Sequence, residues 1–175
     1  MDIEEYAWNQ HEQKLKIQQK EFQPSRPKIK IYDDIVLREE LELKLEALPQ
    51  SQLVDWALSV AIPFLAYLDE HLADDERIRL GVETLQKRKD GLIRAYDLRK
   101  VGFIVNQLAK ESQSDISKYA ARSFAQAIAT GHMRGHAIVS SDYAVKVMNI
   151  IHGDVIQPAT EERERQIQLV DSIGT

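Results

Sequence analysis

Apolar residues recur at helical spacing along most of this chain, and that periodicity constrains the fold more than any other feature of the sequence. In the clearest stripe, leucines recur at i, i+4, i+8 and i+11: Leu37, Leu41, Leu45 and Leu48. Asp33 or Asp34 can cap this helix, and Pro49 ends it. The alternation of apolar and polar residues that marks a half-buried strand is hard to find, so the sequence predicts an all-α fold.

The segment 53–68 is too densely apolar for a helix with one face in water, and it predicts the central helix. Ser51 can cap this helix. We expect Trp56 to lie in the core, where its indole N–H needs an acceptor. Pro63 removes one backbone donor and crowds the carbonyl of Ser59, so a kink is expected at that point.

Five further helices are expected, each bounded by caps, glycines or prolines: one that Asp74 or Asp75 can cap and that ends before Gly91, then 92–108, 116–130, 137–151 and 160–173. The alanines of 116–130 allow neighbouring helices to approach closely. The prediction is therefore a compact array of about seven helices, and the short connections between them predict mostly antiparallel helical hairpins.

Two parts of the chain differ in composition. Residues 1–32 predict an N-terminal helical arm and connector, because the stripe of 3–22 is imperfect and the prolines of 23–31 favour extended backbone. The arm has the pattern of a frayed or partner-dependent helix. Residues 33–175 predict one all-helical domain, since this length and 43% hydrophobic residues can fill a single core.

The composition also limits compartment and chemistry. The chain has no cysteine, which excludes disulfides, a thiol nucleophile and Cys-ligated metals, and which favours a reducing compartment. The acidic, polar start MDIEEYAWNQHEQ is unlike a secretory signal. The longest uncharged apolar run, 57–68, is shorter than the roughly 20 residues that cross a bilayer. We therefore expect a cytoplasmic protein with no membrane partner.

Charge is distributed unevenly around a net value of −5. Residues 33–76 include twelve acidic residues and only two basic ones, Arg38 and Lys44, whereas residues 77–100 include eight basic and three acidic residues. The acidic bias argues against a nucleic-acid partner and suits a basic protein partner, although such a segment is also typical of an ordinary solvated surface. The candidate partner surface comprises Asp69, Glu70, Asp74, Asp75 and Glu76, with Glu39, Glu42 and Glu46 as an extension.

The sharpest local motif is His132-Met133-Arg134-Gly135-His136, whose two histidines have the i, i+4 spacing of zinc metalloproteases. Met133 stands where that motif needs its glutamate, so peptidase chemistry is excluded. Asp142 or His152 could supply a third metal ligand. Gly131 and Gly135 indicate instead a turn between two helices, in which His132 and His136 are structural. Both interpretations stay open.

Motifs for other chemistry are missing from the sequence. It contains no Gly-rich phosphate loop, no G-x-S-x-G elbow and no Ser, His and Asp in a plausible triad order. We therefore assign no catalytic residue and no cofactor, and we do not expect an enzyme.

Several short motifs occur in a fixed order over residues 51–170: Trp56-Ala57, Pro63, Asp75 with Arg77, Gly91, Ala120-Ala121-Arg122, His132, His136, and Tyr143-Ala144 with Lys146. In this order the chain resembles the all-helical immunity proteins of bacterial polymorphic toxin systems. It departs from them at Phe124 and Gln126, where the family often has His and Gly, and near Arg165, where it often has Trp. The resemblance implies a cytosolic antidote that binds and blocks a cognate toxin domain.

Three functions therefore remain open. The first is an immunity protein that binds a basic toxin through a helical, partly acidic surface. The second is a metal-binding helical bundle or metal-dependent enzyme that uses His132 and His136. The third is a scaffold or oligomerisation module, such as a homodimer, with residues 1–22 as its docking arm. The resemblance favours the first.

Overall fold

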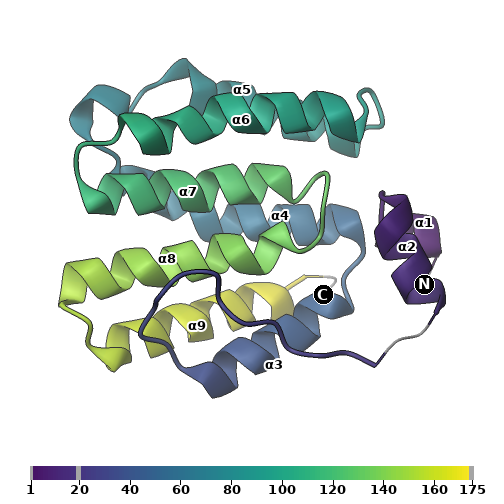
Figure 1. The fold of residues 1–175 in the computed structure, drawn as a ribbon, viewed down its shortest axis with the longest axis horizontal. Helices are drawn as coiled ribbons and strands as arrows, with labels where there is room; N and C mark the ends of the chain where they lie inside the picture. The colour runs from purple at the N-terminus through teal and green to yellow at the C-terminus, as the bar shows by residue number, and fades with distance from the viewer. Residues whose placement is uncertain (1, 19–20, 174–175) are drawn as a thin grey trace.

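The computed structural model describes residues 2–18 and 21–173, and every regular element in these ranges is a helix (Figure 1). The α-helices are α1 (Ile3–Tyr6), α2 (Gln10–Ile17), α3 (Ile35–Glu46), α4 (Gln50–Ala61), α5 (Glu76–Lys89), α6 (Ala95–Glu111), α7 (Asp115–Ala129), α8 (His136–His152) and α9 (Ile156–Asp171). Two 3-10 helices, η1 (Ile62–Tyr67) and η2 (Glu70–Leu72), join α4 to α5. The predicted all-α class is confirmed.

The helices from α5 to α9 pack as successive neighbours, as expected for hairpins, but α3 and α4 do not follow that pattern. Figure 1 shows α6, α7 and α8 lying one below another, with α4 running behind them. Helix α4 contacts α7, α8, α9, η1 and α1, and α3 packs against α9. The described residues hold nine α-helices instead of about seven, because the arm forms two short helices in addition to the seven that follow it.

The central position predicted for 53–68 is confirmed for α4, whose inner face is buried. Trp56 is 1% exposed, and its indole N–H donates to the carbonyl of Gln166 at 3.0 Å. Pro63 changes the helix type: the α-helix ends at Ala61 and the chain continues as the 3-10 helix η1. A missing N–H and a crowded carbonyl explain why the α-helical pattern stops here.

Local capping sets most helix starts. Asp34 accepts from the backbone N–H of Leu37 at 3.1 Å, and Asp75 accepts from that of Arg77 at 2.9 Å. The predicted cap at Ser51 is wrong, because Pro49 takes the N-cap position and α4 begins at Gln50. The Gln50 side chain is buried instead, where its Nε2 donates to the carbonyl of Thr130.

Small residues bring α7 and α8 close together, as the alanine pattern predicts. Ala120, Ala121 and Ala127 are completely buried on α7. Across the contact, Ser123 Oγ donates to the carbonyl of Ser140 at 2.9 Å, and Ser140 Oγ donates to the carbonyl of Ser123 at 2.7 Å. This reciprocal pair fixes the register of the two helices.

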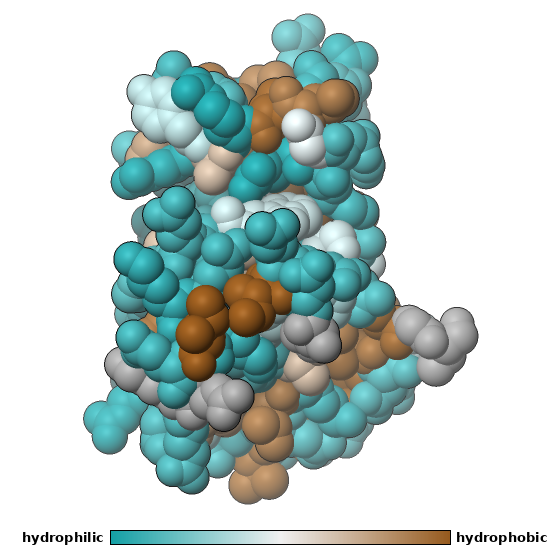
Figure 2. Space-filling model, turned by 90° about the vertical axis from the view of Figure 1, so that its right-hand side faces the viewer, coloured by the Kyte–Doolittle hydropathy of each residue, from teal (hydrophilic) through white to brown (hydrophobic). Residues whose placement is uncertain are grey.

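The described part of the N-terminal segment packs on the body. The helices α1 and α2 stand at one end of the helix array, and the extended connector crosses α8 on its way to α3 (Figure 1). The side-chain amide of Asn149 on α8 holds the connector: its Oδ1 accepts from Tyr32 N at 2.8 Å, and its Nδ2 donates to Tyr32 O at 2.9 Å. Leu15 and Ile17 of α2 are exposed. Figure 2, which views the molecule from the side where Figure 1 places α1 and α2, shows hydrophobic atoms interrupting a hydrophilic surface.

Candidate functional site

The two histidines singled out by the sequence meet at the turn between α7 and α8. His132 lies in the turn and His136 is the first residue of α8. Their rings pack edge to face, with centroids 4.8 Å apart. His136 Nδ1 is 2.7 Å from the side-chain oxygen of Gln126, which can only accept, so this nitrogen carries the proton.

Their surroundings lower the pKa of both imidazoles. Burial, the largest cause, lowers the pKa of His136 to about 4 together with the nearby His132, Lys28 and Arg99. Burial, Arg99 and Arg88 lower the pKa of His132 as well. The charged groups that shift the pKa values of this pair are therefore cationic, and none of them is a carboxylate.

The structure brings neither expected third ligand to the histidines. Asp142 is buried in ion pairs with Arg38 and Arg163, at 2.9 and 2.6 Å. His152 is at the opposite end of α8 from His136, about 24 Å away at 1.5 Å per residue. No group of three or more His, Asp and Glu in the described ranges is placed to hold a metal ion. Two imidazoles alone are a weak basis for a metal centre.

Arg134, between the two histidines, ties the turn to the N-terminal arm, and sequence reasoning missed this role. Its Nη1 donates to the carbonyl of Tyr6 at 2.6 Å and its Nη2 to that of Leu45 at 3.1 Å. The guanidinium lies 3.8 Å from the centre of the Tyr6 ring, and the Arg134 backbone N–H donates to Glu12 at 2.8 Å. The motif is thus a structural junction of three segments that lie far apart in the sequence.

A buried ionic network lies beneath α8 and was also not predicted. Asp142 accepts from both Arg38 and Arg163, and Arg163 also pairs with Asp33 of the connector at 2.7 Å. Arg163 is completely buried and Arg38 is 4% exposed. Carboxylates on both sides of Arg163 compensate the burial of its charge.

The predicted acidic partner surface is only partly free. Asp69 accepts from Gln113 N at 2.6 Å and Ser114 Oγ at 2.7 Å, so it holds the start of α7. Asp75 caps α5 and pairs with Arg77, whose hydrogen bonds lower the pKa of Asp75 to about 2. The carboxylates exposed in this segment are those of Glu70, Asp74 and Glu76.

The proposed extension of that surface lies elsewhere on the molecule. Figure 1 places α3 at the opposite edge of the array from η2 and the start of α5. Glu42 pairs with Arg38 at 3.2 Å, and Glu46 accepts from the hydroxyl of Tyr6 at 2.5 Å. Glu39 is exposed. The eight carboxylates therefore do not form one continuous surface.

The remaining motif residues divide into two groups. Trp56 is in the core, and Asp75 and Arg77 form the start of α5. Arg122 of α7 and Tyr143 of α8 instead lie on the outer side of their helices, where Tyr143 stacks on Tyr119 with ring centres 6.0 Å apart. The second group forms part of an accessible surface.

Comparison with known proteins identifies a family. A family model described as Imm-5 like putative immunity protein matches residues 43–173. No curated protein and no solved structure matches the chain. The matched range begins within α3 and includes all of α4 to α9, so the arm and the connector lie outside it.

Proposed function

We propose that this chain neutralises a toxin by binding it, and the premise is its family: the chain belongs to the Imm-5 like putative immunity proteins. The family resemblance carried by the ordered motifs is thereby confirmed. The match covers most of the chain, and this single observation carries the proposal. We further propose that the protein acts in the cytoplasm, in keeping with a chain that has no cysteine.

The geometry supports binding over catalysis. The side chains best suited to catalysis are engaged in contacts that hold the fold together. His136 is bonded to Gln126, and Asp142 is paired with two guanidinium groups. In the described ranges, no helix is long and apolar enough to pass through a membrane. The outer surface of the helical array is therefore the best candidate for the surface that binds the toxin.

The acidic segment 69–76 remains one proposed contact for the toxin. Its exposed carboxylates, on Glu70, Asp74 and Glu76, would attract a basic surface over a distance and speed association. Two of its five acidic residues are committed to the structure, Asp69 at the start of α7 and Asp75 at the start of α5. With only three exposed charges, we expect the acidic segment to increase the association rate more than it adds to the contact buried in the complex.

The experiment is co-expression with the toxin encoded by the neighbouring gene. We expect growth to be rescued and a complex of the two proteins to survive size-exclusion chromatography. A toxin from an unrelated system is the control, and it should stay lethal in the presence of this chain. If the neighbouring toxin also stays lethal and forms no complex with soluble, folded protein, the proposal is wrong.

A further inference from the structure

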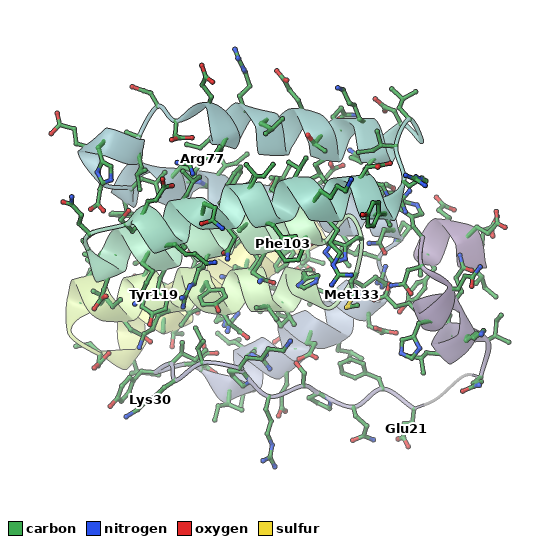
Figure 3. All side chains as sticks on the ribbon, turned by 45° about the horizontal axis from the view of Figure 1, so that its top comes forward. Glu21, Lys30, Arg77, Phe103, Tyr119 and Met133 are labelled. Carbon is green, nitrogen blue, oxygen red and sulfur yellow. The ribbon has the colours of Figure 1, made fainter. Side chains whose placement is uncertain are left out.

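The outer sides of α6, α7 and α8 form one surface that is basic and aromatic. Residues at helical spacing on each helix build it, and we call it the basic face: Arg99 and Phe103 on α6, Tyr119, Arg122 and Gln126 on α7, and His136, Tyr143 and Lys146 on α8. Figure 3 shows Phe103, Tyr119 and Met133 on the same side of the molecule, with Lys30 of the connector below Tyr119.

The cations of this face lack carboxylate partners. In the part of the chain that the structure describes, Arg99, Arg122 and Lys146 form no ion pair. They lie over aromatic rings instead: Arg99 is 5.7 Å from the centre of Phe103, and Arg122 and Lys146 are 5.6 and 5.7 Å from that of Tyr119. Rings hold these cations in place and leave their charge uncompensated.

The carboxylates on the same three helices are all engaged. On α7, Asp115 pairs with Lys118 at 3.4 Å. On α8, Asp142 is buried beneath the helix with Arg38. On α6, Asp97 pairs with Arg94 and Glu111 with Arg77. The centre of the face is therefore positive, although the whole chain carries a net charge of −5.

The connector adds positive charge at the edge of the face. Lys146 Nζ donates to the carbonyl of Lys30 at 3.1 Å, which brings the connector alongside α8. Lys28 is close enough to His136 to lower the pKa of that imidazole, as Arg99 also does. These effects all have the sign expected of a positive local potential.

Apolar and aromatic side chains lie among the cations. Phe103 is 61% exposed and Met133 is 43% exposed. Tyr119 and Tyr143 stack on each other, so they form a preformed platform with little freedom to lose. Arginine, tyrosine, phenylalanine and methionine are the residues that protein interfaces favour, and a mixture of uncompensated charge and exposed ring suits an acidic protein surface with apolar groups.

We infer that the basic face is the main docking surface for the toxin, and that the toxin presents an acidic patch containing apolar side chains. This inference rests on the proposed function. It adds to the acidic segment a second contact, which meets a separate toxin patch of the opposite charge. A protein fits the basic face better than a nucleic acid does. The face itself has three cations without an ion pair, which are few for a phosphate backbone, and the chain as a whole is acidic.

The test compares two charge reversals in the full-length chain. The face variant is Arg122→Glu with Lys146→Glu, at two partly exposed positions. The matched control is Glu161→Lys with Glu164→Lys, which reverses two exposed charges of α9 that belong to neither the basic face nor the acidic segment. The probe is a catalytically inactive form of the toxin encoded by the neighbouring gene, and the readout is its dissociation constant measured by calorimetry. Far-UV circular dichroism and urea unfolding establish that both variants fold like the wild type.

We expect the face variant to bind at least about tenfold more weakly, because it places like charges opposite each other, and the control to stay within about threefold of the wild type. Reversing an acidic residue of the toxin patch to lysine should restore part of the affinity of the face variant. If only the control loses affinity, the inference is wrong and the proposed function stands. If the wild type binds no toxin, the proposed function itself fails, and the inference fails with it.

A nucleic-acid partner is tested in the same series. A fluorescent 20-nucleotide single strand and the corresponding duplex are titrated with wild type and face variant at physiological salt. We expect no saturable binding to either. Binding that the face variant abolishes, together with unchanged toxin affinity, would assign the face to nucleic acid and overturn the inference.

Discussion

Asp142→Asn removes one charge from the most deeply buried ionic network of the fold. Asp142 Oδ1 accepts from Arg38 Nε at 2.9 Å and from Arg163 Nη2 at 2.6 Å, and Oδ2 accepts from Arg38 Nη2 at 2.9 Å. Asp142 is 2% exposed, Arg38 is 4% exposed and Arg163 is completely buried. Asparagine keeps one acceptor oxygen but turns an amide donor toward a guanidinium donor, so at least one of these bonds is lost.

The cost follows from what remains after the substitution. Breaking a buried ion pair by removing one partner costs about 3–5 kcal/mol, because the other charge stays buried without compensation. Here Arg163 keeps Asp33 at 2.7 Å and Arg38 keeps Glu42 at 3.2 Å, which places the expected loss at the lower end, about 3 kcal/mol. For a domain of this size, that corresponds to a fall in melting temperature of about 6–12 °C.

Urea unfolding followed by circular dichroism at 222 nm measures the change in the free energy of unfolding. The control is Asp171→Asn, which removes the exposed Lys44–Asp171 pair at 2.8 Å and should cost far less, because solvent screens an exposed pair. A loss for Asp142→Asn no larger than that of the control, with an unchanged denaturant slope, would refute the reasoning that this network is buried and coupled.

Three further predictions follow from close packing, protonation and a buried donor. In Gly131→Ala the new Cβ would overlap side-chain methyl groups of Leu98 and Leu85, so the free energy of unfolding should fall by about 1–3 kcal/mol. Gly135→Ala, whose new Cβ meets nothing within 4 Å, should change it far less in the same urea assay. The pKa of His136 is lowered from 6.5 to about 4, so the unfolded chain binds a proton at higher pH than the folded chain does. The free energy of unfolding should therefore fall by up to about 3 kcal/mol as the pH is lowered from 6.5 to 4, and His136→Gln should flatten that part of the pH profile. Trp56→Phe removes the donor to Gln166 O and some buried volume, and thermal unfolding should show a loss of about 1–3 kcal/mol.

The helix positions were predictable because the signals that set them are local. The leucines of α3 and the caps at Asp34 and Asp75 depend on residues at most a few positions apart, and the structure confirms them, except that α3 ends at Glu46, before Leu48 of the predicted stripe. Ser51 shows where local reasoning fails, since a serine and a proline two residues apart are both acceptable helix starts and the buried Gln50 decides between them. Trp56 could be placed in the core, but Gln166 could not be identified as its acceptor.

The polar interior could not be predicted for a different reason. Arg38 and Asp142 are 104 residues apart, and nothing in the local sequence distinguishes this pair from the many exposed charges around it. The same limit explains the acidic segment, where Asp69 and Asp75 have the composition of a surface but are used to hold α7 and α5. Charge counted along the chain therefore indicated an acidic contact, while charge arranged on the fold indicates the basic face.

The buried network and the basic face are connected by α8. The inner side of α8 is held by Asp142 and by Ser140, which fixes its register against α7. Because the two helices cannot slide, Tyr119 and Tyr143 stay stacked, and the cations of Arg122 and Lys146 stay at a set spacing over that platform. A surface ordered before binding loses less conformational entropy when its partner docks, so the ion pairs that stabilise the interior also favour tight binding outside.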